Sequence, residues 1–241
     1  MTNLLLIATL ILSPVLQGQD VGIGKADKLF SSRDNLESLR QAATLMEEMA
    51  AREKTNFEAH WRLAKYRYYL ADVETDESKK TKLIQSAIVT AKKAVELDGS
   101  RVEGHFWLAA TNGALADLKG GISSIGLVKS IRKEFQAALA IDPAYENGAS
   151  YLALGEIDLN LPRLLGGNDR RGIEKLEEGL KGYQSNAELK LALASAYEKK
   201  GRRDEARKLL ESILSTDDPA RTPNEIQDIR NKARTLMDKT K

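Results

Sequence analysis

The sequence contains no cysteine, and this absence excludes several kinds of site. Without a thiol the chain can form no disulfide, no thiolate zinc site and no cysteine nucleophile. It also lacks the N-terminal cysteine to which the lipid of a bacterial lipoprotein is attached. We therefore expect no lipid anchor.

Other scarce residues restrict the function further. The 241 residues include only five prolines and two histidines, and Lys plus Arg (37) nearly equals Asp plus Glu (35), for a net charge of +2. Few prolines favour long helices. Because acidic and basic residues nearly balance, the sequence has no excess of positive charge of the kind expected of a nucleic-acid binder. No Ser-His-Asp order, paired catalytic carboxylates or nucleotide fingerprint is recognisable. We expect a protein that is not an enzyme, needs no cofactor or metal, and does not bind nucleic acid.

The N-terminus carries a short apolar run, Leu4 to Leu12, followed by Ser13-Pro14. Nine residues are too few to cross a bilayer core of about 30 Å. A run of this length before a segment of small residues is typical of a secretory signal peptide. We predict a signal peptide over residues 1–18, cleaved after Gly18, a polar linker over 19–25, and an exported protein, periplasmic or secreted. A short retained anchor is the alternative.

The rest of the chain repeats one signature, Leu followed by Ala or Gly and, downstream, a closing Leu and Asp. The first halves lie 45, 46 and 39 residues apart, at Leu63-Ala64, Leu108-Ala109, Leu154-Gly155 and Leu193-Ala194. A period of this size indicates an array of similar units. Each unit is a helix pair that buries its apolar face only against its neighbours.

We therefore predict an all-α fold, a right-handed superhelical array of helix pairs with terminal capping helices. It forms one domain over 26–241, with units of about 26–56, 57–101, 102–144, 145–186 and 187–219 and a closing helix over 224–239. Within it, Gly120 to Gly126 reads as an inter-helix loop, since it lacks the Gly-Lys-Ser/Thr ending of a phosphate-binding loop. Pro162 to Asn168 reads as a structural turn or, alternatively, a ligand-facing loop.

The fourth signature unit has the spacing of a tetratricopeptide repeat, carried by Leu193, Ala194, Tyr197, Gly201, Ala206 and Leu210. Other segments, above all 161–168 (LPRLLGGN), resemble the TatT family, the tetratricopeptide T components associated with TRAP-type solute transporters. A weaker likeness, centred on the His-x-Trp helix around His105 and Trp107, is to regulator of microtubule dynamics proteins. The TatT resemblance implies a periplasmic helical protein with a groove or pore and a solute-binding protein as partner. TatT members are commonly lipoproteins, and this chain departs from them by lacking cysteine.

In tetratricopeptide repeats, fixed positions of the first helix face the concave side. These positions are Trp61, Lys65 and Tyr68, then Phe106, Ala110 and Gly113, then Leu152, Glu156 and Leu159. Such a surface is mainly apolar and could bind a protein partner or, alternatively, a small organic or lipid-like ligand. A neighbouring subunit of a homo-oligomer or an additional helix could also fill it.

The two histidines, His60 and His105, each lie three residues before a Leu-Ala mark. They therefore occupy equivalent places on neighbouring helices. A metal site would need further ligands at recognisable spacing, and none is apparent. We expect packing roles for both.

Overall fold

The computed structural model describes residues 14–240, and the side chains within 21–120 and 126–240. In this part of the chain all regular structure is helical, with no strand. The helices are α1 (Pro14–Ser31), α2 (Leu36–Arg52), α3 (Phe57–Val73), α4 (Glu77–Leu97), α5 (Val102–Lys119), α6 (Gly121–Ile141), α7 (Tyr145–Asn160), α8 (Asp169–Gly182), α9 (Ala187–Lys199), α10 (Arg203–Ser215) and α11 (Pro223–Lys239). The predicted all-α fold is confirmed.

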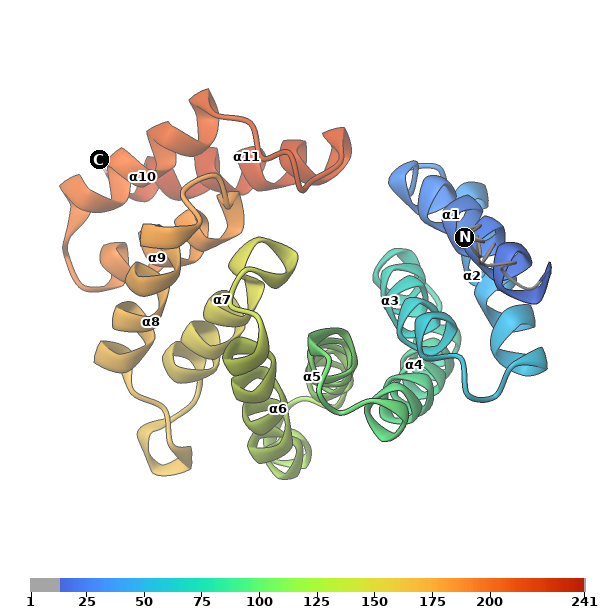
Figure 1. Cartoon of the computed structure of the whole chain (residues 1–241). Helices are drawn as coiled ribbons and strands as arrows, with labels where there is room; N and C mark the ends of the chain where they lie inside the picture. The colour runs from blue at the N-terminus through green and yellow to red at the C-terminus, as the bar shows by residue number, and fades with distance from the viewer. Residues whose placement is uncertain (1–13, 241) are drawn as a thin grey trace, which may run out of the picture.

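The helices form five antiparallel pairs that follow a curved path, and α11 closes the array (Figure 1). In each pair the odd-numbered helix lies on the inside of the curve and the even-numbered helix on the outside. Successive inner helices contact one another directly, α1 with α3, α3 with α5, α5 with α7 and α7 with α9. The inner helices of successive pairs pack more closely against one another than the outer helices do. The array therefore curves, as expected of stacked repeats.

Asparagine side chains begin several of the helices. Asn35, Asn56, Asn168 and Asn186 each accept a hydrogen bond from a backbone N–H of the first turn of α2, α3, α8 and α9. Such caps satisfy donors that have no partner within the helix. At α2 the cap is Asn35, which accepts from two backbone N–H groups, those of Glu37 and Ser38.

Small residues let the two helices of a pair approach closely. A Cβ added to Gly155 in α7 would lie 2.7 Å from the Leu176 side chain, and one on Gly172 in α8 would lie 2.9 Å from the Gly155 carbonyl oxygen. Leu154, beside Gly155, is buried in the core. The small residue of the Leu-Ala or Leu-Gly signature therefore marks a point of helix contact.

Two segments expected to be irregular are helical. Residues 19–25, predicted as a linker, belong to α1. Residues 121–126, predicted as a loop, belong to α6, because Gly120 alone makes the turn with a backbone φ of 60°. Glycine adopts positive φ without steric cost. One glycine is therefore enough to connect α5 and α6, where a loop of seven residues was predicted. The apolar run Leu4 to Leu12 lies outside the described residues.

No helix in the described part of the chain combines the length and the apolar character needed to cross a membrane. The apolar side chains of these helices are instead buried in three clusters, one around α1 to α3, one around α3 to α7 and one around α8 to α11.

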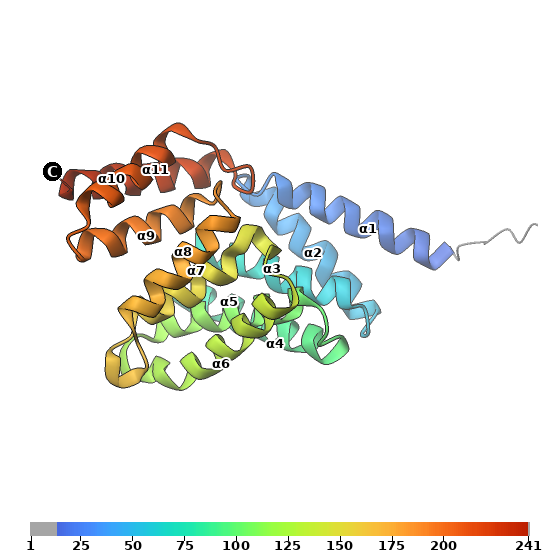
Figure 2. The same ribbon diagram turned by 60° about the vertical axis from the view of Figure 1, so that its left-hand side comes forward.

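The two ends of the array are joined by polar contacts. Arg33, between α1 and α2, donates from Nε and Nη2 to the Glu225 carboxylate, both at 2.7 Å, across 192 residues of sequence. Asp34 accepts from the Thr222 hydroxyl at 2.6 Å and from the Asn224 backbone N–H at 3.2 Å. Figure 2 shows the turn after α1 beside the loop between α10 and α11. We call these contacts the clasp, and they close the curved array into a ring.

Candidate partner-binding surface

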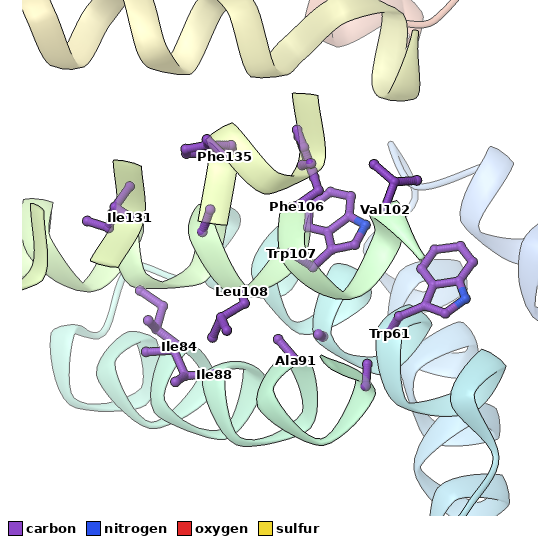
Figure 3. Packing of buried hydrophobic residues seen from close by; sticks show 14 of the residues in the cluster. Trp61, Ile84, Ile88, Ala91, Val102, Phe106, Trp107, Leu108, Ile131 and Phe135 are labelled. Carbon is purple, nitrogen blue, oxygen red and sulfur yellow. The ribbon is translucent and has the colours of Figure 1, made fainter. Parts of the chain in front are cut away.

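Two of the aromatic residues predicted on the concave face belong to the core. Trp61 is 9% exposed and Phe106 is 6% exposed, and both lie in the cluster around α3 to α7 (Figure 3). Phe106 packs edge-to-face against Phe135 and Tyr145. The Trp61 indole N–H donates to Glu58. These positions face inward in the repeat, but other side chains of the chain cover them.

The cover over Phe106 comes from the start of α7. Tyr145 packs on Phe106 and accepts a hydrogen bond from the Trp107 indole at 2.8 Å. The next three residues are left-handed, with φ of 48° at Glu146, 56° at Asn147 and 78° at Gly148. This conformation is favourable for glycine, tolerated by asparagine and unfavourable for glutamate. With this backbone conformation, the start of α7 lies over Phe106 on the inner face.

The left-handed segment is held from both sides. Glu146 accepts a hydrogen bond from Lys65 of α3 at 2.6 Å, so Lys65 is engaged in an ion pair and not free for a ligand. The Asn147 carbonyl accepts from the Asn186 side chain at 2.8 Å. Gly148 lies against Tyr183, where an added Cβ would be 2.2 Å from the ring. The segment is thus a fixed part of the inner surface.

The remaining predicted positions lie further along the inner helices. Tyr68, Ala110, Gly113, Leu152 and Leu159 are partly buried, and Glu156 is exposed to solvent. A Cβ added to Gly113 would meet no atom within 4 Å, so open space lies in front of this position. The part of the inner face that is open to a partner therefore surrounds Tyr68, Gly113 and Glu156. Whether these residues bind a partner remains a prediction.

Carboxylates of the other inner helices act electrostatically on this open part: Asp72, Asp117 and Glu188 raise the pKa of Tyr68, and Asp117 and Glu188 raise that of Glu156. Together with Glu156 they are four carboxylates, one from each of four successive inner helices. We call them the inner acidic cluster. Although Glu156 is exposed at its surface, its desolvation within the curve of the array, together with the charges of Glu188 and Asp117, raises its pKa to about 7. Burial also raises the pKa of Glu188, although its ion-pair partner Arg221 opposes the change. Glu156 is the only acidic residue among the predicted concave positions, so this surface is more acidic than predicted.

Asp72, Asp117 and Glu188 were not predicted from the sequence. Glu188 is the second residue of α9, and the equivalent second residues of α3 and α5 were not among the predicted positions either. Extending the predicted positions to α9 would have given Leu191, Ser195 and Glu198 instead. Asp72 and Asp117 lie one turn beyond Tyr68 and Gly113, because α3 and α5 continue past the length of a standard repeat helix. Only the helix lengths revealed them.

The two histidines have the same structural role in neighbouring units. The Nε2 atom of His60 bonds to the Lys54 carbonyl oxygen at 3.1 Å, and that of His105 to the Gly99 carbonyl oxygen at 3.0 Å. Each bond reaches back six residues and holds the turn that precedes an inner helix. The other nitrogen of His105 bonds to Glu134 at 2.6 Å. No group of three or more potential metal ligands occurs within the described residues.

The Pro162 to Asn168 segment is anchored to the end of α7. The Asn168 backbone N–H donates to the Asp158 carbonyl oxygen at 2.7 Å, and Arg171 donates to the Gly166 carbonyl oxygen at 2.8 Å. A Cβ on Gly167 would lie 1.8 Å from the Leu161 carbonyl oxygen. These contacts give the segment a structural role, while the tip residue Leu164 is 99% exposed.

Two surface hollows lie away from the predicted site. One, of about 810 Å³, is lined by polar residues that include Arg163, Asp169 and Lys200. The other, of about 790 Å³, lies between α8 and α10 over α9 and includes Leu180, Leu193 and Leu209. Neither includes a residue of the predicted concave set.

Comparison with family models identifies two parts of the chain. Residues 23–155 match the model described as regulator of microtubule dynamics protein 1-3, and residues 170–222 match a tetratricopeptide repeat model. A curated relative, regulator of microtubule dynamics protein 1 of Bos taurus, is 30% identical over 120 residues. That match covers 49% of this chain but only 36% of the bovine protein.

Solved structures show the same fold along most of the chain. A thermophilic tetratricopeptide repeat protein of Thermus thermophilus has a TM-score of 0.67 at 20% identity, covering 90% of this chain and 98% of its own. The pilF protein of Pseudomonas aeruginosa has a TM-score of 0.58 at 15% identity, covering 91% and 90%. At these identities the likeness establishes the fold alone.

Proposed function

The chain belongs to the regulator of microtubule dynamics protein 1-3 family, and from that premise we propose that it is a non-enzymatic scaffold whose inner face binds a protein partner. Arrays of tetratricopeptide repeats generally bind proteins and generally carry no chemistry of their own. The supporting observation is the open part of the inner face around Tyr68, Gly113 and Glu156, where helices of three successive units contribute to one surface. Such a continuous surface suits an extended partner segment.

A photoreactive side chain on the inner face tests this proposal. A benzoylphenylalanine in place of Gly113 points into open space, and one in place of Val89, which is 67% exposed on the outer helix α4, is the matched control. In cells of the source organism, we expect a discrete cross-linked partner at position 113 and none at 89. The partner, once purified, should bind the unmodified protein and lose affinity for Gly113→Trp. Equal cross-linking at both positions would contradict an inner-face site.

Export is a further part of the proposal. It rests on the apolar run Leu4 to Leu12 and the small residues that follow it. Cleavage after Gly18 would remove only the first part of α1 and would keep Ala26 and Phe30, which are the buried residues among the described side chains of α1. Mass spectrometry of the exported protein should find Gln19 at its N-terminus. An intact Met1 in a cytosolic fraction would contradict export.

For the partner itself we propose a periplasmic solute-binding protein of a TRAP-type transporter, as the resemblance of 161–168 to the TatT family implies. TRAP genes beside the gene for this protein would support that identity. A purified solute receptor encoded there should co-elute with this protein in size-exclusion chromatography. Separate elution at micromolar concentrations would contradict it.

The alternative function, a carrier of a small organic or lipid-like ligand, has less support on the concave face. Tyr145 covers Phe106, so part of the expected apolar lining is already filled by the chain. The apolar hollow between α8 and α10 is the place that favours a ligand of this kind. Native mass spectrometry of the purified protein distinguishes the two functions, because a carrier retains a co-purified small molecule.

A further inference from the structure

The hollow between α8 and α10 combines an apolar lining with a buried cation. Its volume of about 790 Å³ is within the range of sites that hold small organic ligands. Leu180 of α8, Leu193 of α9 and Leu209 of α10 supply apolar surface from three helices. Lys190 of α9 also lines the hollow, although it is only 6% exposed. A largely enclosed positive charge therefore lies beside the leucines.

The ammonium group of Lys190 has fewer partners than it can bind. It carries three N–H donors. It donates to the Ser212 hydroxyl at 2.9 Å and forms no ion pair with any described residue. Burial lowers the pKa of the group, and the charge of Asp218 partly opposes this change. The Asp218 carboxylate itself accepts hydrogen bonds from the backbone N–H groups of Ala187 and Ala220, both at 3.0 Å. A buried charge ordinarily has a paired counter-ion, and the described part of the chain supplies none to Lys190.

Lys190 also departs from the pattern of the other units. His60, His105 and Tyr151 occupy the same place, three residues before the Leu-Ala or Leu-Gly signature. Both histidines bond to the turn that precedes their own helix, and Tyr151 packs against the ring of Tyr183. Lys190 instead reaches across to α10 along the hollow. A position that makes local packing contacts in three units therefore carries a charge into a hollow in the fourth.

The acidic residues of the hollow are already paired. Arg202 donates from Nε to Glu205 at 2.7 Å and forms an ion pair of 3.6 Å with Glu177. Lys181 and Lys208 are exposed lysines of the same hollow, and neither forms a hydrogen bond or ion pair with a described residue. The hollow therefore has an excess of uncommitted positive charge around its apolar lining. This combination favours a ligand with a negative group and a hydrocarbon part.

We infer that this hollow binds an aliphatic carboxylate, whose negative group lies at Lys190 and whose hydrocarbon chain lies on the leucines. The carboxylate supplies the counter-ion that Lys190 lacks, and the chain removes apolar surface from water. No residue of the inner acidic cluster lines the hollow, so the inference does not rest on the proposed scaffold function. It gives the alternative function, that of a carrier, a site and a class of ligand.

Isothermal titration calorimetry with hexanoate, octanoate and decanoate tests both parts of the site in the unmodified protein. Each added pair of methylene groups should raise the affinity several-fold, because each buries more apolar surface. Decyltrimethylammonium, which has a chain of similar length and the opposite charge, should bind at least tenfold more weakly than decanoate. An affinity that does not depend on chain length would overturn the inference. Equal affinities for the anionic and cationic compounds would also overturn it.

Lys190→Met tests the buried cation, because it removes the charge and keeps a long apolar side chain. We expect decanoate to bind about tenfold more weakly, since a hydrogen bond to a charged group is lost. The control, Lys82→Met, removes an exposed charge from α4 and should leave the affinity unchanged. The melting temperatures of both variants show whether the fold is retained. Equal affinities of the two variants for decanoate would contradict the role of Lys190.

Octaglutamate distinguishes an acidic peptide from a small ligand. It carries carboxylates without a hydrocarbon chain, so we expect it to bind more weakly than decanoate. Tighter binding of octaglutamate would overturn the assignment of an aliphatic ligand and would indicate an acidic peptide in its place.

The outcomes are separable from those of the scaffold proposal. Gly113→Trp should keep the affinity for decanoate, and Lys190→Met should keep the cross-links at position 113. Decanoate binding without cross-links would retain this site and remove the cellular partner. Cross-links without decanoate binding would remove this site and leave the scaffold in place.

Discussion

Lys65 of α3 and Glu146 of α7 form an ion pair of 2.6 Å although 81 residues separate them. The pair spans the inner side of α5, and its acidic member lies in a left-handed backbone segment. Contacts of this kind maintain a conformation that the local sequence alone would not adopt.

Substitutions at Asn147 test that strain. Its φ of 56° is tolerated by asparagine, is favourable for glycine and is costly for a β-branched residue. We expect Asn147→Val to lower the free energy of unfolding by about 1–2 kcal/mol and Asn147→Gly to leave it unchanged or raise it. The hydrogen bond from the Asn186 side chain is accepted by the backbone carbonyl of residue 147, so both variants keep it. Equal urea midpoints for the two variants would show that the segment is not left-handed in solution.

Trp61→Ala distinguishes a packing role from a binding role. Because Trp61 is in the core, we expect the variant to lose about 3–5 kcal/mol of stability and to melt at a clearly lower temperature. Val89→Ala, at an exposed position of α4, should melt like the unmodified protein. If Trp61→Ala melts like the unmodified protein but no longer binds the partner, Trp61 belongs to the binding surface and not to the core.

Glu156→Gln should make stability less dependent on pH. The pKa of Glu156 is about 7 in the folded protein and near 4.5 in the unfolded chain, so between these values the folded state holds the additional proton. Its contribution to stability therefore decreases as pH rises from about 4.5 to 7 and stays low above 7. Glu188, Asp117 and Lys232 are the charges that act on it.

The measurement is the melting temperature as a function of pH. We expect Glu156→Gln to melt above the unmodified protein at pH 8 and to differ little from it at pH 4.5. Glu48→Gln, on the outer face, controls for the general loss of one charge. A constant difference across the pH range would contradict the raised pKa.

The clasp can be measured by a double-mutant cycle on Arg33 and Glu225. Both side chains are largely buried, at 11% and 24% exposure, and two charge-assisted hydrogen bonds join them. Arg33→Ala also removes contacts with the rings of Phe30 and Tyr69, and the cycle subtracts that effect. We expect a coupling energy of about 0.5–3 kcal/mol from urea unfolding. Additive effects of the two substitutions would mean that the ends do not touch in solution.

The sequence predicted the repeats well because their signal is local and periodic. Leu154-Gly155 and Leu193-Ala194 mark positions where helices pack, and the closing helix predicted over 224–239 is observed as Pro223–Lys239. The predicted loop over 120–126 was wrong because three glycines within seven residues suggest a loop, whereas a single positive φ at Gly120 makes the turn.

The inner surface was less predictable because it depends on contacts between distant units. The repeat pattern assigns Phe106 to the concave face, but it cannot anticipate that a left-handed segment brings Tyr145 over it. Likewise, the contact between Arg33 and Glu225 is not marked by any repeated sequence pattern, because it forms only when the curvature of the whole array brings its two ends together.

The clasp also affects how the protein unfolds. An open array of repeats has two free ends, and each terminal unit, which has a neighbour on one side only, can fray before the rest. The clasp bonds the first unit to the last, so neither end of the array is free. A terminal unit can therefore fray only after the bonds of the clasp have broken. Unfolding should therefore be a single all-or-none transition in the intact protein. In Arg33→Ala, hydrogen exchange should become fastest in α1 and α11, and the transition should separate into steps.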